Sequence, residues 1–301
     1  MADYHSERKE RHHAKGREPI LTRTSKEIEA RYERRGKVGE VERLELQMQA
    51  LSSEVESELG ILGIKHGMSI LDVGCGSGGF ARRVAPLVSP AIVHAIDSDP
   101  LFLREAKRLA DSEGIRNVAF ENYDILDMGF EASTFDLTYC RFILPFIRNQ
   151  AQLMSELTRV TREGGLIASS EAGYAFNYPP MPKFERIFDG IAKWRKKRTG
   201  VKRPPTVDAY ELFKRHMLDS VTAYPIPIFA SQNEPERLRH LTSVQSKMLE
   251  IHKGAALSGG FMKMKDYVAG TSELETWLAK PNAFVMVLCV LTLGRVPTKG
   301  S

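Results

Sequence analysis

Short apolar runs alternate along this chain with longer stretches that carry an apolar residue every three or four positions. The short runs predict β-strands in the first half of the chain, at residues 68–73, 92–97, 118–122, 135–140 and 165–171. The longer stretches between them predict helices at residues 79–88, 101–112 and 150–160. Repeated strand–helix units of this length predict an α/β fold with a doubly wound, mostly parallel sheet.

The pattern changes on both sides of these units. Two helices, at residues 25–36 and 40–59, are expected before the first strand. Residues 173–205 are rich in aromatic residues and proline, so we expect a cap there, with a helix at 182–197. The remaining elements are expected as a helix at residues 207–217, a strand at 221–229, helices at 234–253 and 264–278, and an apolar strand at 283–293. Pro225 and Pro227 favour an edge position for the strand that contains them, because proline has no N–H to donate.

The first strand runs directly into a glycine-rich turn and a helix. Asp72 closes the strand, and Gly74 and Gly76 follow it in the turn. A buried strand that turns sharply through glycines into a helix is typical of nucleotide-binding α/β folds, because the backbone comes close to the ligand. Gly74 and Gly76 with Gly79 also fit the dinucleotide fingerprint, and Asp97 at the end of the second strand suits the ribose of either cofactor class.

Further motifs distinguish a dinucleotide site from a site for another nucleoside-containing cofactor. Asp97 ends the second strand, Asp124 follows the third, and an Arg-Glu-Gly-Gly-Leu loop at residues 162–166 leads into the fifth. With residues 71–78, this series resembles the class I S-adenosylmethionine (SAM)-dependent methyltransferases over most of residues 40–296. Residues 42–47, 140–142 and 178–180 resemble the small-molecule branch that includes quinone-biosynthesis and natural-product enzymes. The resemblance implies a Rossmann-like, seven-stranded, mostly parallel sheet with a C-terminal antiparallel strand, N-terminal helices and a helical cap after the fifth strand.

The resemblance also implies roles for residues at the strand ends. Gly74 and Gly76 leave room for the methionine part of SAM beside Cys75, and Asp72 reaches its ammonium. Asp97 accepts hydrogen bonds from the ribose hydroxyls, and Ser98 lies beside the adenosine. At the adenine of SAM, the resemblance implies Asp124 and the N–H of Ile125. At the methionine tail it implies the Cys140 carbonyl, Arg141 and Gln47. The expected product is S-adenosyl-L-homocysteine.

Aromatic residues after the fifth strand indicate the acceptor. Tyr174, Phe176 and Tyr178 are expected to face the methyl donor and hold a planar or apolar substrate. Phe142 and Ile143 form the expected opposite wall, with Tyr32 as a lid. We expect an aromatic or polycyclic metabolite, methylated mainly by proximity and in-line orientation, with Tyr178, Tyr174 and Arg141 as positioning residues. Core packing of these aromatic residues is the alternative, and the histidines at positions 216, 240 and 252 are expected to lie at the surface or at helix caps.

Composition and charge set the remaining limits. The formal charge is +5, and residues 1–37 hold 11 lysines and arginines against 7 acidic residues, so the rest is nearly balanced. A basic cluster at residues 193–198 is expected to form a solvated helix face. The apolar run at residues 283–293 is about half of what a membrane span needs. The three cysteines follow no metal-ligand spacing, and no metal is expected. We therefore expect a cytoplasmic protein with a small-molecule substrate, no membrane attachment and no nucleic-acid partner.

Two rival functions stay open at this level. A nicotinamide-dependent oxidoreductase fits the glycine fingerprint, and an RNA or DNA methyltransferase fits the basic segments. Against the latter, residues 140–143 lack the turn that clasps a flipped base. A homo-oligomer, dimeric or larger, is expected through the N-terminal helices. The expected divisions are a basic arm (1–24), N-terminal helices (25–60), the SAM-binding core (61–172), the cap (173–218), the C-terminal completion of the sheet (219–296) and a tail (297–301).

Overall fold

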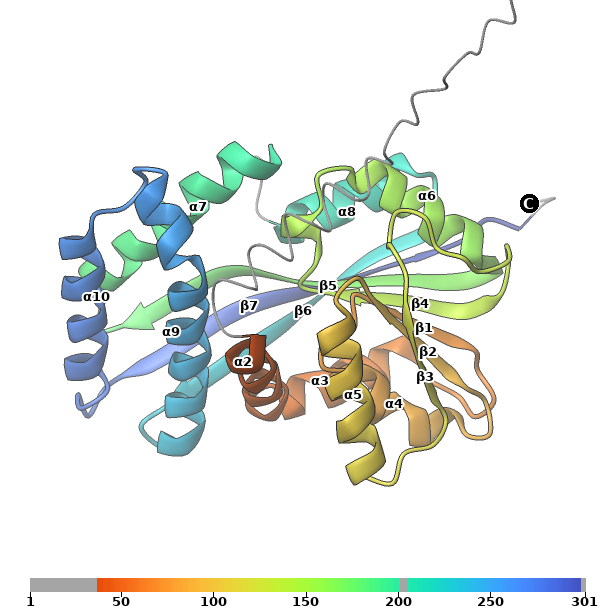
Figure 1. Ribbon diagram of the computed structural model, residues 1–301, viewed down its shortest axis with the longest axis horizontal. Coiled ribbons are helices and arrows are strands. Elements are labelled where there is room, and N and C mark those ends of the chain that lie inside the picture. The colour runs from red at the N-terminus through yellow and green to blue at the C-terminus, as the bar shows by residue number, and fades with distance from the viewer. Residues whose placement is uncertain (1–36, 201–204, 299–301) are drawn as a thin grey trace, which may run out of the picture.

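The computed structural model describes residues 37–200 and 205–298, which form one mixed sheet covered by helices (Figure 1). The strands are β1 (Ile70–Val73), β2 (Val93–Asp97), β3 (Val118–Asn122), β4 (Phe135–Arg141), β5 (Thr161–Tyr178), β6 (Asp219–Ser231) and β7 (Phe284–Arg295). Their order across the sheet is β3-β2-β1-β4-β5-β7-β6. β1 to β5 pair in parallel, and β7 runs antiparallel to both β5 and β6. The predicted fold class is confirmed.

Helices cover both faces of the sheet. The helices are α2 (Lys37–Ala50), α3 (Ser52–Leu62), α4 (Gly79–Val88), α5 (Pro100–Ser112), α6 (Gln150–Val160), α7 (Pro182–Thr199), α8 (Pro205–Arg215), α9 (Pro235–Ser258) and α10 (Met264–Trp277), with the 3-10 turn η1 (Leu144–Phe146). α3, α4 and α5 lie on one face, and α6 and α8 on the other (Figure 1). All four residues of β1 are buried, as expected for a central parallel strand that is covered on both faces.

The long strands β5, β6 and β7 extend beyond the parallel part of the sheet. Around this extension lie α7, α9 and α10, and α9 also packs against α2 (Figure 1). The expected cap at residues 173–218 is therefore divided. α7 belongs to this helical group, whereas α8 packs against β5, β7 and α6 in the sheet's own helical layer.

Several local predictions hold. Pro100 begins α5 and Asp99 caps it, with Asp99 Oδ1 accepting from the N–H of Leu101 at 2.9 Å. β6 lies at the edge of the sheet, beside β7, as its prolines predict. The expected helix at residues 40–59 is two helices, because Leu51 departs from helical geometry (φ −105°, ψ 21°). The expected helix at residues 25–36 lies outside the described residues.

The fifth strand is longer than predicted. It continues from Glu171 to Tyr178 by pairing with β7, through partners such as Phe176 with Met286. On this extension Tyr174, Phe176 and Tyr178 are 68%, 48% and 43% exposed. Phe176 and Tyr178 pack against Phe284 with ring centroids 5.9 and 5.4 Å apart. Cross-strand pairing with β7 thus replaces the expected cap loop.

Candidate active site

A cavity of about 890 Å³ lies at the carboxyl ends of the parallel strands. Loops after β1, β2, β3 and β4 and the strand β5 form one side, and α2, α7 and α9 supply the other. Residues far apart in the chain meet here because parallel strands end at the same edge of a sheet. The sequence-predicted residues that line it are Gln47, Asp72, Gly74, Cys75, Gly76, Asp97, Ser98, Asp124, Ile125, Arg141, Phe142 and Ile143.

The glycine turn after β1 forms the floor of the cavity. The N–H groups of Gly74 and Cys75 donate to the Ile96 carbonyl of β2 at 2.8 and 2.9 Å, which fixes the turn between two strands. Gly74 and Gly76 have φ values of 72° and 55°, a region that favours glycine. A Cβ at Gly76 would lie 2.9 Å from Leu44 of α2, and one at Gly74 would lie 2.9 Å from Ile143. Glycine therefore keeps the cavity open at both positions.

Asp97 at the end of β2 braces this turn. Its Oδ2 accepts from the N–H of Gly76 at 2.9 Å, and its Oδ1 accepts from the N–H of Asp99 at 2.9 Å. Burial raises the pKa of Asp97 to about 6, although the backbone hydrogen bonds act in the opposite direction. Each carboxylate oxygen has a second acceptor position, so Asp97 can also accept from a ligand in the cavity.

Asp72 and Arg141 place opposite charges beside the glycine turn. Asp72 Oδ2 and all three guanidinium nitrogens of Arg141 are buried and have no hydrogen-bond partner among the described residues. Arg141 Nη1 lies 3.6 Å from Glu58 Oε2, outside hydrogen-bond distance. Burial raises the pKa of Asp72 to about 7, and the nearby Asp97 adds to this, whereas a hydrogen bond from the Ala81 backbone and the Arg141 charge lower it. The pair can satisfy a ligand that carries both a cation and an anion.

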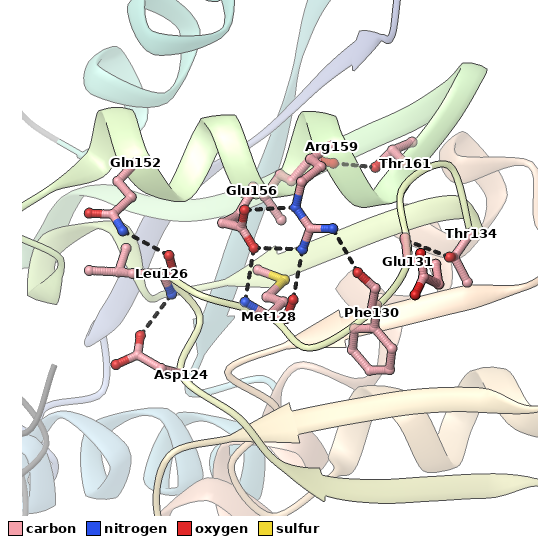
Figure 2. Close-up of polar contacts among 11 residues, drawn as sticks. Asp124, Leu126, Met128, Phe130, Glu131, Thr134, Gln152, Glu156, Arg159 and Thr161 are labelled. Carbon is pink, nitrogen blue, oxygen red and sulfur yellow. Dashed lines mark hydrogen bonds and ion pairs between the residues drawn. The ribbon is translucent and has the colours of Figure 1, made fainter. Parts of the chain in front are cut away.

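The loop after β3 carries Asp124 and is tied to α6 (Figure 2). Gln152 Nε2 donates to the Leu126 carbonyl at 2.9 Å, and the N–H of Met128 donates to Glu156 Oε2 at 2.9 Å. Arg159 donates to the carbonyls of Met128 and Phe130 at 2.7 and 2.6 Å and pairs with Glu156. These bonds fix the wall in which Asp124 accepts from the N–H of Leu126.

Replacing Arg159 with methionine is expected to loosen this loop. Two backbone carbonyls lose a charged donor, so we expect the free energy of unfolding to fall by about 1–2 kcal/mol. Amide hydrogen exchange should quicken around residues 124–130. Arg108→Met is the matched control, because Arg108 makes an exposed pair with Glu105 at the same spacing and has no backbone carbonyl as a partner within the described residues. Equal stability losses in urea unfolding of the two variants, with unchanged exchange in the loop, would contradict the assignment.

Helix α2 closes the cavity from above the glycine turn. Arg43 pairs with Glu40 at 2.8 Å and donates to Gln47 Oε1 at 3.2 Å, so the predicted Gln47 belongs to a fixed polar group on this helix. Both Arg43 and Glu40 line the cavity. The predicted lid residue Tyr32 lies outside the described residues.

Sequence reasoning missed the other half of the cavity. Glu171, Arg195 and His252 line it, together with Phe146, Met248 and Ile251. His252 is buried on α9, where its Nδ1 lies 2.8 Å from the Met248 carbonyl, so the expected surface position is wrong. Arg195 belongs to the basic cluster that was expected to be solvated, and it is half-buried, whereas Lys193, Lys196 and Lys197 are exposed. Glu171 does carry a signal, since it is an acidic residue near a strand end, like Asp72 and Asp97.

Four predicted residues do not line the cavity. Tyr174, Phe176 and Tyr178 lie on the extension of β5, where pairing with β7 holds this segment in the sheet, and they are not among the residues that line the cavity. Cys140 is buried in β4. Phe142 does line the cavity and has a positive φ of 57°, which is unusual for a bulky residue and turns the chain after β4.

Comparisons with known proteins identify the family to which the chain belongs. A family model described as a methyltransferase domain matches residues 64–217, slightly more than half of the chain. Aklanonic acid methyltransferase DauC of Streptomyces sp. (strain C5) is 31% identical over 118 residues, which are 38% of this chain and 54% of DauC. Sterol 24-C-methyltransferase erg6 of Aspergillus fumigatus is 31% identical over 111 residues, 36% of this chain and 29% of that protein. The chain thus spans about half or less of these relatives.

Solved structures share the fold. A putative methyltransferase from Bacillus halodurans superposes with a TM-score of 0.54 at 19% identity, over 82% of this chain and 100% of that chain. The phosphoethanolamine N-methyltransferase 2 of Haemonchus contortus, solved with S-adenosylhomocysteine, gives a TM-score of 0.53 at 18% identity, over 82% of this chain and 53% of that one. The family match covers the strands and loops that build the cavity, and the chain belongs to the methyltransferase domain family.

Proposed function

We propose that the chain transfers a methyl group from S-adenosylmethionine to a small acceptor. The observation that carries the proposal is that Asp72 Oδ2 and the guanidinium nitrogens of Arg141 are buried beside the glycine turn with no hydrogen-bond partner among the described residues. The methionine end of SAM has an ammonium and a carboxylate, and the two side chains match these charges. Such a fit leaves no buried charge uncompensated when the cofactor binds.

The rest of the cavity suits the nucleoside end of the cofactor. Asp97 can accept hydrogen bonds from the ribose diol. Asp124, in the loop after β3 that α6 holds in place, can accept a hydrogen bond from the adenine amino group. SAM supplies an activated methyl group that an in-line displacement removes from sulfur. The protein's contribution is to fix both reactants in one enclosed space and to exclude water.

The acceptor side supports a small, aromatic substrate. Its walls include Phe142, Ile143 and Phe146, and α2, α7 and α9 enclose it. An aromatic or polycyclic metabolite, as in secondary metabolism, is the acceptor we propose. A cytoplasmic homo-oligomer is proposed with it. Among the helices of the described part of the chain, none is long and apolar enough to cross a membrane.

Calorimetric titration with S-adenosylhomocysteine tests the cofactor assignment. The ligand's ammonium favours ionised Asp72, whose pKa is raised to about 7, so at pH 6 binding should release about one proton from Asp72. Asp97, whose pKa is about 6, adds a smaller release at that pH, and at pH 8.5 binding should release almost none. In the variant Asp72→Asn, the number of protons released on binding at pH 6 should fall by about one, because asparagine carries no titratable proton. NAD serves as the control ligand and should not bind. Binding of NAD alone, or S-adenosylhomocysteine affinity that does not change with pH, would contradict the proposal. Methyl-labelled SAM with metabolite extracts, followed by mass spectrometry, then identifies the acceptor.

A further inference from the structure

Glu171 presents a buried carboxyl group to the acceptor half of the cavity. Its side chain is fully buried on β5, and Oε1 accepts from the N–H groups of Ile143 and Leu144 at 3.2 and 3.1 Å. Ser169 Oγ lies 3.5 Å from the same oxygen. Oε2 is buried and has no hydrogen-bond partner within the described part of the chain. One oxygen therefore fixes the group, and the other is left for a ligand.

This carboxyl group adjoins the predicted cofactor site. The N–H of Ile143 donates to Glu171, while the side chain of Ile143 is the group that a Cβ at Gly74 would meet. In space, Ile143 therefore lies between Glu171 and the glycine turn. An acceptor atom bound at Oε2 would lie in the same cavity as the cofactor.

Charged groups from other elements surround Glu171. Burial raises the pKa of Glu171 to about 8, although the hydrogen bonds from the Leu144 and Ile143 N–H groups and from Ser169 lower it, as does the charge of Arg195 to a smaller extent. Arg195 belongs to α7 and lines the same cavity. The neighbouring thiols of Cys140 on β4 and Cys289 on β7 stay protonated, since burial raises the pKa of each to about 12. His252 of α9 lines the cavity as well.

The chemistry of this pair selects the acceptor. Both groups can act on one neutral hydroxyl, because a carboxylate accepts a proton and a guanidinium donates hydrogen bonds to oxygen. A hydroxyl can give its proton to Glu171 while its oxygen stays on Arg195. A phenolic hydroxyl has a pKa of about 10, as in tyrosine, which a base with a raised pKa can match.

We propose, on the basis of the methyl-transfer function above, that the acceptor carries a phenolic hydroxyl, that Glu171 is its general base and that Arg195 binds its oxygen. The O–H bond breaks and the proton moves to Glu171 Oε2. An electron pair of the oxygen forms the bond to the methyl carbon. The carbon–sulfur bond breaks at the same time, and the electron pair of that bond stays on sulfur. The products are a methyl ether, a thioether and protonated Glu171, which returns its proton to solvent.

The test compares 2-naphthol with 2-methoxynaphthalene, which share a ring system and differ in the acidic proton. Both are titrated at pH 8 into the protein saturated with S-adenosylhomocysteine, by calorimetry and by absorption. We expect 2-naphthol to bind at least tenfold more tightly and its spectrum to move towards that of naphtholate. This shift should grow from pH 6 to pH 8 and then level off, because only ionised Glu171 takes the proton.

Variants separate the base from a structural role. Glu171→Gln keeps an oxygen for the N–H groups of Ile143 and Leu144 but cannot take a proton, so both the naphtholate signal and the tenfold preference should disappear. Arg195→Met should weaken 2-naphthol binding at least tenfold and leave 2-methoxynaphthalene binding within twofold. Glu275→Gln, on the exposed face of α10, is the matched control and should behave as the unmodified protein.

The outcomes distinguish this inference from the proposed function. If S-adenosylhomocysteine does not bind, the methyl-transfer function itself fails. If it binds while the two naphthalenes bind equally, or neither binds, the phenol inference is overturned and the cofactor assignment stands. A naphtholate signal that survives in Glu171→Gln overturns the role of Glu171 as base.

Discussion

Asp97→Ala is expected to abolish S-adenosylhomocysteine binding, with at least a hundredfold loss of affinity by calorimetry. The carboxylate acts twice in the proposed site, because it accepts from the N–H of Gly76 and from that of Asp99 and also offers acceptors for the ribose diol. Its loss leaves a turn N–H without its partner and removes two charge-assisted bonds to the ligand. Unchanged affinity would overturn the cofactor assignment.

The neighbouring Asp99→Ala is the control for this change. Asp99 accepts from the N–H of Leu101 at the start of α5 and does not line the cavity. Its replacement should lower the free energy of unfolding by about 1 kcal/mol, as for other N-caps, and should leave ligand affinity within about threefold. Equal affinity losses in the two variants would indicate that Asp97 acts only through the local fold.

Gly76→Ala is expected to weaken S-adenosylhomocysteine binding at least tenfold. The new methyl group would lie 2.9 Å from Leu44, so α2 must shift away from the floor of the cavity. A residue other than glycine at a φ of 55° also costs about 1 kcal/mol of stability. Calorimetry gives the affinity, and urea unfolding gives the stability.

The chain offers a matched control for this backbone effect. Gly63 at the end of α3 has a φ of 64°, and a Cβ there would meet nothing within 4 Å. Gly63→Ala should therefore lose similar stability and keep full ligand affinity. If both variants lose affinity alike, backbone strain explains the result, and the contact between α2 and the glycine turn plays no part.

Much of the cofactor half could be predicted because its signals are local. Asp72 is the second-last residue of β1 and Asp97 is the last residue of β2, and Gly74 and Gly76 lie in the turn directly after β1. A strand that ends in an acid and a glycine turn has this form wherever it occurs in a parallel sheet, so neighbouring residues suffice to recognise it. The order of strands and helices likewise follows from hydrophobic periodicity.

The acceptor half could not be predicted because it is assembled from distant elements. Arg195 belongs to a basic run on α7, and nothing in that run distinguishes the residue that faces the cavity from those that face solvent. His252 and Met248 lie on α9, more than a hundred residues after the glycine turn. Tyr174 and Tyr178 lost their expected place because pairing with β7, a long-range interaction, continued β5 past Glu171.

By itself, the sequence determined the α/β class, the edge position of β6 and the strand-end residues Asp72, Asp97 and Asp124, since these depend on periodicity, proline chemistry and short motifs. Only the tertiary structure decided which side chains enclose the acceptor. The helices α2, α7 and α9 reach the cavity by packing over the sheet and its extension, and such packing depends on side chains that meet across the fold. Glu171 illustrates both cases, because its strand could be predicted from the sequence, whereas the position of Arg195 in the same cavity could not.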